Sequence, residues 1–120
     1  MQTEVREKNL FMAKIANNAE RYEDMVSFMN NVVRCKLPLL EEERKLLSRA
    51  YKKTIESKRI AWRSIVSSES EEEVKGTNPH MSYVRDYKSE LEREMLIVCD
   101  EIIELINDFL LPPVIGEKEA

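Results

Sequence analysis

The sequence predicts an all-α protein built from antiparallel helices in one domain, and three observations lead to this prediction. The chain has 120 residues, which is the length of a single domain. It holds only 2 Gly and 4 Pro, while strong helix formers such as Glu, Lys, Leu and Met are common. Hydrophobic residues (42%) recur at steps of three and four over most of the chain, so each predicted helix has an apolar face for a core.

The first two helices are predicted from amphipathic spacing. A first helix is expected over residues 7–19, because Leu10, Phe11 and Ile15 fall on one side of it. A second is expected over residues 22–34, where one stripe holds Tyr22, Met25, Val26, Met29, Val32 and Val33. We expect Met25 and Met29 to be core residues rather than part of a ligand site. Pro38 then marks a turn, since it has no backbone N–H to donate.

A long third helix is expected from Glu41 to Ser68. Three acids, Glu41, Glu42 and Glu43, suit the positive end of a helix, and neither Gly nor Pro follows before Ser68. One side of this helix is predicted to lie in the core or in an interface; it carries Leu47, Ala50, Tyr51, Thr54, Ala61 and Ile65, with Trp62 adjacent.

The segment 67–78 (SSESEEEVKGTN) is polar and acidic and contains Gly76, so we expect a solvated, mobile loop that binds nothing. Pro79 suits the first turn of a fourth helix, which is expected to end near Leu110, before Pro112 and Pro113. The predicted organisation is therefore a helical region over residues 1–111 and a tail over residues 112–120.

The charge balance excludes a strongly basic protein. There are 19 Lys and Arg against 23 Asp and Glu, so the net charge is −4 and we expect no nucleic acid partner. The charge is unevenly distributed: residues 1–60 carry 13 basic and 9 acidic residues, and residues 61–120 carry 6 and 14. This asymmetry favours a charged partner or a second subunit of opposite charge.

The cysteines and the N-terminal residues predict in which cellular compartment the protein is found. Cys35 and Cys99 form no CxxC pair and no dense disulfide framework, so we expect both to be small buried side chains in a cytoplasmic protein. The N-terminal residues are charged where a signal peptide needs an apolar run. No apolar stretch approaches the roughly 20 residues of a membrane span, so we expect no membrane insertion.

The strongest functional pattern is a line of charged residues on the third predicted helix. Spacings of 4, 3, 4, 3 and 4 place on one face Lys45, Arg49, Lys52, Glu56, Arg59 and Arg63. Arginine forks and a nearby lysine suit a phosphate group, which they bind through charge-assisted hydrogen bonds. A solvated surface with no ligand is the alternative interpretation of the same pattern, and a carboxylate or an acidic helix of a partner would use the same groups less specifically.

No pattern predicts an enzyme. His80 is the single histidine and is expected to be an ordinary surface residue. Two glycines, Gly76 and Gly116, are too few for a phosphate-binding glycine loop, and neither cysteine has a second metal ligand at a suitable spacing. We therefore expect no catalytic residues, no metal and no cofactor.

Three separate blocks resemble the 14-3-3 family. They are residues 19–25 (AERYEDM), 44–52 (RKLLSRAYK) and 58–63 (KRIAWR), and the similarity continues through 85–88 (RDYK) to 109–112 (FLLP). The resemblance implies a dimeric, non-enzymatic, all-helical adaptor that binds phosphoserine and phosphothreonine peptides. Family members are roughly twice this length, so the resemblance covers their first four helices and stops before the helix that supplies a second phosphate-binding arginine and its neighbouring tyrosine.

Matching the family's motifs residue by residue implies that three residues lie on the phosphate side of the third helix: Lys52, Arg59 and Arg63. Of these, Arg59 is implied to be a direct phosphate ligand. Two departures affect this site. Arg49 stands where the family usually has a small apolar groove residue, and Glu56 stands where it usually has glycine. A carboxylate one turn from Lys52 and Arg59 is expected to compete with a phosphate.

The resemblance also implies a dimer, in which the first two helices of one subunit pack on the third and fourth of the other. The implied interface residues are Ile15, Ala19, Ala61, Ile65 and Tyr87, together with a pair between Arg21 and Glu94 across the dimer. Packing within one chain is the alternative role for these side chains. Asp24 would face Glu90 where the family often has lysine, which would weaken the contact slightly.

The predicted function is therefore a phosphopeptide-binding adaptor. The chain corresponds to the N-terminal half of such an adaptor, with an incomplete ligand groove. It is expected to act as a homodimer or as a heterodimer with family members. The alternative is a helical dimerisation or structural protein that has lost phosphopeptide binding. The departures at Arg49 and Glu56, together with the absence of the second half, favour this alternative more strongly than they would in a full-length family member.

Overall fold

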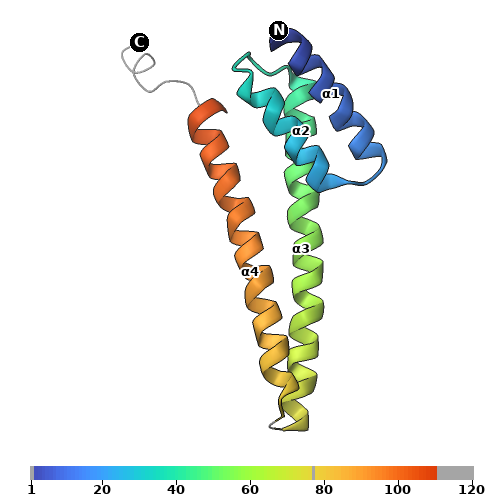
Figure 1. Cartoon of the computed structure of the whole chain (residues 1–120), viewed down its shortest axis with the longest axis vertical. Coiled ribbons are helices and arrows are strands. Elements are labelled where there is room, and N and C mark those ends of the chain that lie inside the picture. Colours follow the sequence, from blue (N-terminus) through green and yellow to red (C-terminus); the bar gives the residue numbers. More distant parts are fainter. Residues whose placement is uncertain (1, 77, 111–120) are drawn as a thin grey trace.

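The computed structural model describes residues 2–76 and 78–110, and helices account for most of them (Figure 1). The helices are α1 (Gln2–Asn18), α2 (Tyr22–Arg34), α3 (Glu41–Lys75) and α4 (His80–Leu105), followed by a π-helical turn, η1 (Ile106–Leu110). α3 and α4 form a long antiparallel hairpin, and α1 and α2 pack beside the N-terminal half of α3. The prediction of an all-α fold of antiparallel helices is confirmed. None of the helices within the described ranges is long and apolar enough to span a membrane.

Short turns separate the first three helices. α1 begins before the expected residue 7, at Gln2, and the chain reverses at Glu20, whose φ of 58° is the left-handed conformation in which a helix commonly ends. The Arg21 N–H donates to the Ala16 carbonyl at 2.9 Å across this turn. α2 ends similarly, at Lys36 with φ of 62°, and an extended stretch containing Pro38 leads to α3.

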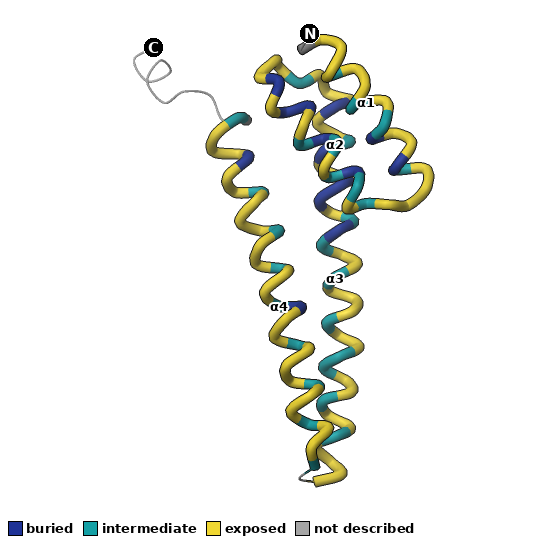
Figure 2. Tube along the Cα trace, in the orientation of Figure 1, coloured by how far each residue is buried: buried dark blue, intermediate teal, exposed yellow. Residues whose placement is uncertain are grey.

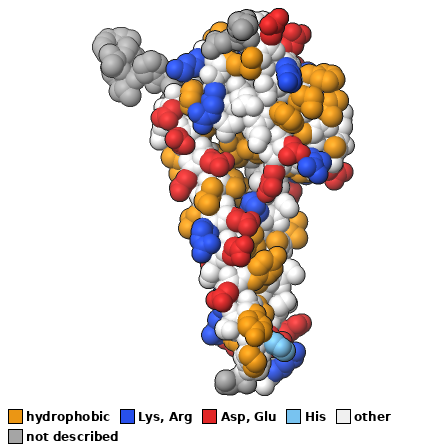
Figure 3. All heavy atoms as spheres, viewed as in Figure 1, with side chains coloured by type: hydrophobic (Ala, Val, Ile, Leu, Met, Phe, Trp, Pro, Cys, Tyr) orange, Lys and Arg blue, Asp and Glu red, His pale blue; other side chains and the backbone are white. Residues whose placement is uncertain are grey.

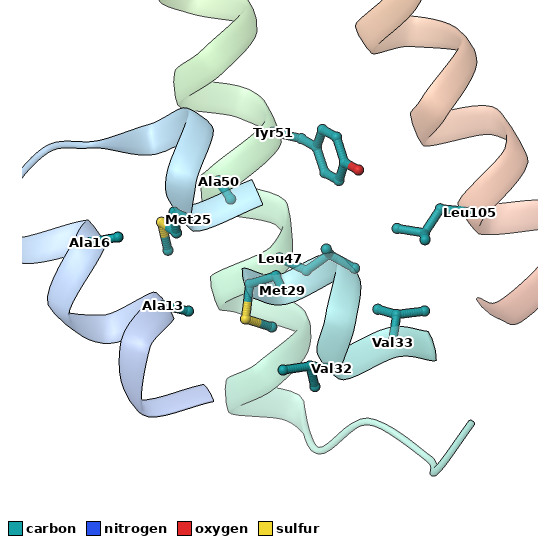
Figure 4. Close-up of a cluster of buried hydrophobic side chains, with 10 residues drawn as sticks. All are labelled: Ala13, Ala16, Met25, Met29, Val32, Val33, Leu47, Ala50, Tyr51 and Leu105. Atoms are coloured by element: carbon teal, nitrogen blue, oxygen red, sulfur yellow. The ribbon is translucent and has the colours of Figure 1, made fainter. Parts of the chain in front are cut away.

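The core lies at one end of the molecule. Its buried side chains come from all four helices (Figure 4): Ala13, Ala16, Met25, Met29, Val32, Val33, Leu47, Ala50, Tyr51 and Leu105. The expected core roles of Met25 and Met29 are confirmed, and so are those of Leu47, Ala50, Tyr51 and Thr54 on α3. Beyond this core, most residues of the hairpin are exposed or half-buried (Figure 2). The exposed part of α3 is therefore held in place by a core at its N-terminal half.

A buried charge joins α1 to the start of α3. The Glu43 side chain is 2% exposed and forms an ion pair with Arg6 of α1. Its Oε1 atom also accepts a hydrogen bond from the Leu40 N–H at 2.9 Å, which satisfies a backbone donor at the first turn of α3. One carboxylate thus fixes both the start of α3 and the position of α1 against it.

The prediction of a loop over residues 67–78 is wrong for residues 67–75, because α3 continues to Lys75. That the segment is mobile and binds nothing stays a prediction. Three of the four acids that suggested a solvated loop are paired instead. Glu69 lies 2.8 Å from Lys88 and 3.3 Å from Arg85, and Glu72 lies 3.0 Å from Lys75. These cations offset the repulsion between neighbouring carboxylates, and glutamate is itself a good helix former.

The next helix begins one residue later than the proline suggested. Pro79 is the N-cap residue of α4 rather than part of its first turn, and the Asn78 side chain accepts a hydrogen bond from the His80 N–H at 2.8 Å. α4 ends at Leu105 and passes into η1, which reaches the expected limit at Leu110. The predicted tail, residues 112–120, lies outside the described residues.

The two cysteines differ in burial. Cys35 is buried, as expected, whereas the expectation of a buried Cys99 is wrong, because Cys99 is exposed on α4. Its neighbours Val98 and Ile102 are the half-buried residues that pack against the core. Cys99 lies outside the apolar stripe by which α4 packs against the core.

Candidate functional site

The predicted line of charged residues forms one exposed face of α3. Its six members, Lys45, Arg49, Lys52, Glu56, Arg59 and Arg63, are all exposed. They share a face because α3 is continuous from Glu41 to Lys75, so residues three and four apart lie above one another. The opposite side of the same helix supplies buried Leu47 and Ala50 to the core. The core therefore fixes the direction in which the cations point.

Three of these cations are unpartnered within the part of the chain that the structure describes. Lys52, Arg59 and Arg63 form no hydrogen bond and no ion pair with another described residue. On an α-helix Lys52 and Arg59 are separated by about 10 Å along the axis, and Arg59 and Arg63 by about 6 Å. Two guanidinium groups one turn apart, without a carboxylate to neutralise them, can accept a phosphate or a carboxylate ligand.

Arg49 has a different role, because it is tied to the α1–α2 unit. Its Nε donates to the Asn17 side chain of α1 at 2.7 Å, and its guanidinium lies 5.9 Å from the centre of the Tyr22 ring on α2. Arg49 is thus part of a contact between three helices.

A hollow on α3 lies beside these cations. It has a volume of about 490 Å³ and is lined by Lys45, Ser48, Arg49, Lys52, Lys53 and Glu56; we call it the basic hollow. Glu56 lies 3.5 Å from Lys53, and its side chain is 62% exposed. Glu56 is one helical turn from Lys52 and from Arg59 in sequence, but it forms its ion pair with Lys53. Its competition with a phosphate stays a prediction.

An apolar groove adjoins the basic hollow. It lies between α3 and α4, has a volume of about 370 Å³, and is lined mainly by Leu47, Tyr51, Ile55, Ile102, Leu105 and Ile106. Ser48 and Lys52 belong to both linings. The surface near Lys52 is thus amphipathic, with cations on one side and aliphatic side chains on the other.

Lys58 is a residue whose role the spacing did not predict. Its ammonium lies 3.1 Å from Glu23 of α2 and 3.1 Å from Glu94 of α4, so it joins three helices. Burial lowers the pKa of Lys58, but the hydrogen bonds and charges of Glu94 and Glu23 outweigh this effect and the net change is upward. Both carboxylates are more than 30 positions from Lys58 in sequence, so no local pattern could have identified the contact.

The predicted interface residues lie on two surfaces of this chain. Ile15 on α1 is 44% exposed and Tyr87 on α4 is 62% exposed, and Ala19 and Ala61 are exposed as well. Ile65 is half-buried. Hydrophobic side chains gather over α1 in Figure 3. Two further apolar residues of α1, Val5 and Phe11, are exposed. Within one chain Arg21 pairs with Asp24 at 2.7 Å, and Glu94 pairs with Lys58.

The single histidine is an exposed residue at the junction of α3 and α4, as expected. Its Nδ1 atom lies 4.0 Å from Glu72, and its ring centre lies 6.0 Å from that of Tyr83. Among the residues that the structure describes, no group of three His, Cys, Asp or Glu side chains is arranged to hold a metal ion.

Comparison with known proteins identifies relatives of the chain. The model of the 14-3-3 protein family matches residues 12–120. The chain is 46% identical over 109 residues to the 14-3-3-like protein GF14 chi of Arabidopsis thaliana, covering 89% of this chain and 41% of that protein. It is similarly 44% identical to a 14-3-3-like protein of Solanum tuberosum and 46% identical to one of Pisum sativum, with 89% of this chain and 42% of each relative covered. The chain thus spans about two fifths of the length of these relatives.

Proposed function

Because this chain belongs to the 14-3-3 family, we propose that it is an adaptor that binds phosphoserine and phosphothreonine peptides through α3. Lys52, Arg59 and Arg63 are the proposed phosphate ligands, and Arg59 makes the most direct contact. The observation that carries this proposal is that all three are exposed on one face of a helix and have no partner among the described residues. A dianionic phosphate satisfies two guanidinium groups better than a single carboxylate does.

The proposed ligand lies along α3, with its phosphate at Arg59 and Arg63. The basic hollow and the apolar groove meet at Lys52, so they offer the flanking residues of a peptide both charged and aliphatic contacts. Recognition of phosphorylated segments by arginine clusters is an established mode of binding. No catalytic step is proposed, and the protein acts by binding.

We further propose that the protein acts as a homodimer or as a heterodimer with other family members. The proposed interface joins α1 of one subunit, with Ile15 and Ala19, to α3 and α4 of the other, with Ala61, Ile65 and Tyr87. The exposure of Ile15 and Tyr87 supports it, because large apolar side chains on both surfaces are left uncovered in a single chain. In the proposed dimer, Arg21 leaves its ion pair with Asp24 and pairs with Glu94 of the other subunit.

We also propose that the protein is located in the cytoplasm, a reducing compartment that suits an exposed thiol such as Cys99.

The alternative function is a structural helical dimer that no longer binds phosphopeptides. Glu56 is the observation in its favour, because it adds a negative charge to the proposed site. Its ion pair with Lys53 reduces that effect, since a carboxylate held by Lys53 is less available to Arg59.

Titration of a labelled phosphoserine peptide and its unphosphorylated twin against the full chain tests the proposal. Wild type is compared with Arg59→Ala and with Arg93→Ala, which removes an exposed arginine of α4 that has no ion pair among the described residues. We expect binding to require the phosphate and to weaken about tenfold or more in Arg59→Ala, but not in Arg93→Ala. If both variants bind like wild type, or if the twin binds equally well, the structural dimer replaces the adaptor.

A further inference from the structure

The far end of the α3–α4 hairpin carries a serine in a strongly acidic setting. Ser70 of α3 is exposed, and the three residues that follow it are Glu71, Glu72 and Glu73. A protein kinase that selects acidic substrates holds the carboxylates next to the acceptor serine with basic side chains, through charge-assisted ion pairs. Three consecutive acids directly after a serine are therefore a pattern that such a kinase binds.

The Ser70 hydroxyl is available for reaction. It forms no hydrogen bond with another described residue, whereas the nearby Ser68 hydroxyl donates to the Ser64 carbonyl at 3.3 Å. The buried residues of α3 end at Thr54, and residues 67–75 are exposed or half-buried throughout (Figure 2). Because ion pairs near the surface contribute little stability and no core lies beneath these turns, they open locally at small cost and present an extended segment to a kinase.

A second serine has a similar sequence but a different setting. Ser89 of α4 is followed directly by one acid, and Glu92 is at the third position after it. Glu92 accepts a hydrogen bond from the Trp62 indole N–H at 2.9 Å, and Leu91 beside it is buried. Extending this segment for a kinase would break packing in the middle of the hairpin. The structure therefore favours Ser70 as the acceptor.

We propose that Ser70 is a phosphorylation site for an acid-directed protein kinase and that its phosphate loosens the end of the hairpin. The Ser70 Oγ atom attacks the γ-phosphorus of ATP, the bond between that phosphorus and the oxygen bridging to the β-phosphate breaks, ADP leaves, and the hydroxyl proton passes to a base of the kinase. The product carries a charge of about −2 near neutral pH. Neither part of this inference depends on the proposed phosphate ligands of α3.

The new charge falls beside carboxylates that already share one cation. Glu69 and Glu73 lie 3.3 Å and 3.8 Å from the Arg85 guanidinium of α4. Glu69 is adjacent to Ser70 and Glu73 is three residues after it, so a phosphate on Ser70 repels both carboxylates and competes with them for Arg85. The ion pairs that join the end of α3 to α4 are thereby weakened. We expect residues 70–75 to unfold locally more often.

Incubation of the full chain with an acid-directed serine/threonine kinase, ATP and Mg²⁺ tests the first part of the inference. Tandem mass spectrometry locates the phosphate, and its rate of incorporation is compared for wild type, Ser70→Ala and the matched control Ser89→Ala. A synthetic peptide of residues 65–76 shows whether the kinase accepts the sequence when it is unfolded. We expect phosphate on Ser70 of wild type, incorporation at background level in Ser70→Ala and an unchanged rate in Ser89→Ala.

Amide hydrogen exchange of the phosphorylated chain tests the second part. We expect the amides of residues 70–75 to exchange about threefold faster or more than in the unphosphorylated chain, and those of core residues 47–54 to exchange alike. Arg85→Gln removes the same ion pairs without a phosphate, so this variant is expected to accelerate exchange at residues 70–75 in the unphosphorylated chain.

Several results would overturn the inference. Phosphate on Ser89 or on another serine in place of Ser70 would do so, and so would a kinase that modifies neither the chain nor the peptide. A kinase that modifies the peptide but not the full chain would show that helical Ser70 is inaccessible. Unchanged exchange at residues 70–75 after phosphorylation would overturn the loosening of the hairpin. None of these measurements involves phosphopeptide binding, so their failure is distinct from failure of the proposed function.

Discussion

Glu56 is the side chain that we expect to tune the proposed site. It is the single carboxylate among the five cations of the line on α3, and it lies against Lys53. The carboxylate would repel a ligand phosphate near Lys52 and Arg59, but water and salt screen this repulsion because the site is exposed. We therefore expect the effect on affinity to be moderate.

Glu56→Gln and Glu56→Gly are both expected to raise the affinity for a phosphoserine peptide, by about two- to fivefold, because each removes the negative charge. Glycine also costs about 1 kcal/mol of helix stability, whereas glutamine is a good helix former and costs little. Peptide titration gives the affinities, and urea unfolding followed by circular dichroism gives the stabilities. Weaker binding by Glu56→Gln would show that the carboxylate helps the ligand rather than competing with it.

Glu43 and Glu42 are neighbouring acids with very different surroundings. Glu43 is 2% exposed and pairs with Arg6, while the Glu42 side chain is 69% exposed. Glu43→Ala leaves a half-buried arginine and the Leu40 N–H without their partner, so we expect a loss of about 3 kcal/mol of unfolding free energy. Glu42→Ala, the matched control, is expected to change stability by less than about 0.5 kcal/mol. Equal losses in thermal or urea unfolding would show that Glu43 does not hold α1 on α3.

At the scale of single residues the sequence predicted which charges share a face, because that follows from helical spacing alone. It could not predict their partners. Lys58 contacts Glu23 and Glu94, more than 30 positions away, and Arg49 contacts Asn17. These contacts depend on the angles at which helices cross, which spacing within one helix does not contain.

At the scale of elements, α3 is longer than its composition suggested. Residues 67–75 have the acidic, serine-rich composition of a loop, yet Glu69 pairs with Arg85 and Lys88 on the antiparallel neighbour α4. The helix boundary therefore depends on a tertiary contact. The ends of the other helices were predicted to within about five residues, because prolines and amphipathic spacing are local signals.

The ion pairs between α3 and α4 predict a weakening of this end of the hairpin in acid. The hydrogen bond from Lys88, with help from Arg85, holds the pKa of Glu69 below its ordinary value of 4.5. Because the folded pKa is lower than the unfolded one, the stability from this pair is fully present above the unfolded pKa and is lost as the pH falls through the folded pKa. The loss is thus expected below about pH 4.5 and not near neutrality.

Titration of the Glu69 carboxyl by NMR checks this expectation. Lys88→Met is expected to move the midpoint up toward the ordinary value, because it removes the main donor to the carboxylate. Lys53→Met serves as the control, since Lys53 pairs with Glu56 on another part of α3. An unchanged Glu69 midpoint in Lys88→Met would mean that the pair is not formed in solution.

The whole molecule is elongated and leaves apolar surface uncovered. Its radius of gyration is 19.0 Å, against about 14 Å for a compact domain of this length. The core occupies one end only, and Phe11, Ile15 and Tyr87 are exposed. Such surfaces are typical of a protein that buries them against a partner.

Self-association of the full chain at micromolar concentration is the expected consequence. Ile15→Glu is predicted to weaken it strongly, because the new charge would be buried in the proposed interface. Val74→Glu, which places a charge at an 88% exposed apolar position at the far end of the hairpin, is the control and is expected to associate like wild type. Sedimentation equilibrium measures the association state of the wild type and of both variants. A wild-type monomer of 14.1 kDa with full helicity would contradict the proposed dimer.

The most direct test of the account is a map of backbone amide shifts in the isotope-labelled full chain, recorded with a phosphoserine peptide and with its unphosphorylated twin. Binding of the phosphate by α3 predicts phosphate-dependent shifts concentrated at residues 49–63, absent with the twin and lost in Arg59→Ala. Shifts that are the same with both peptides would contradict the claim that this face of α3 binds the phosphate. Shifts on α1 and α4 while residues 49–63 are unaffected would also contradict it.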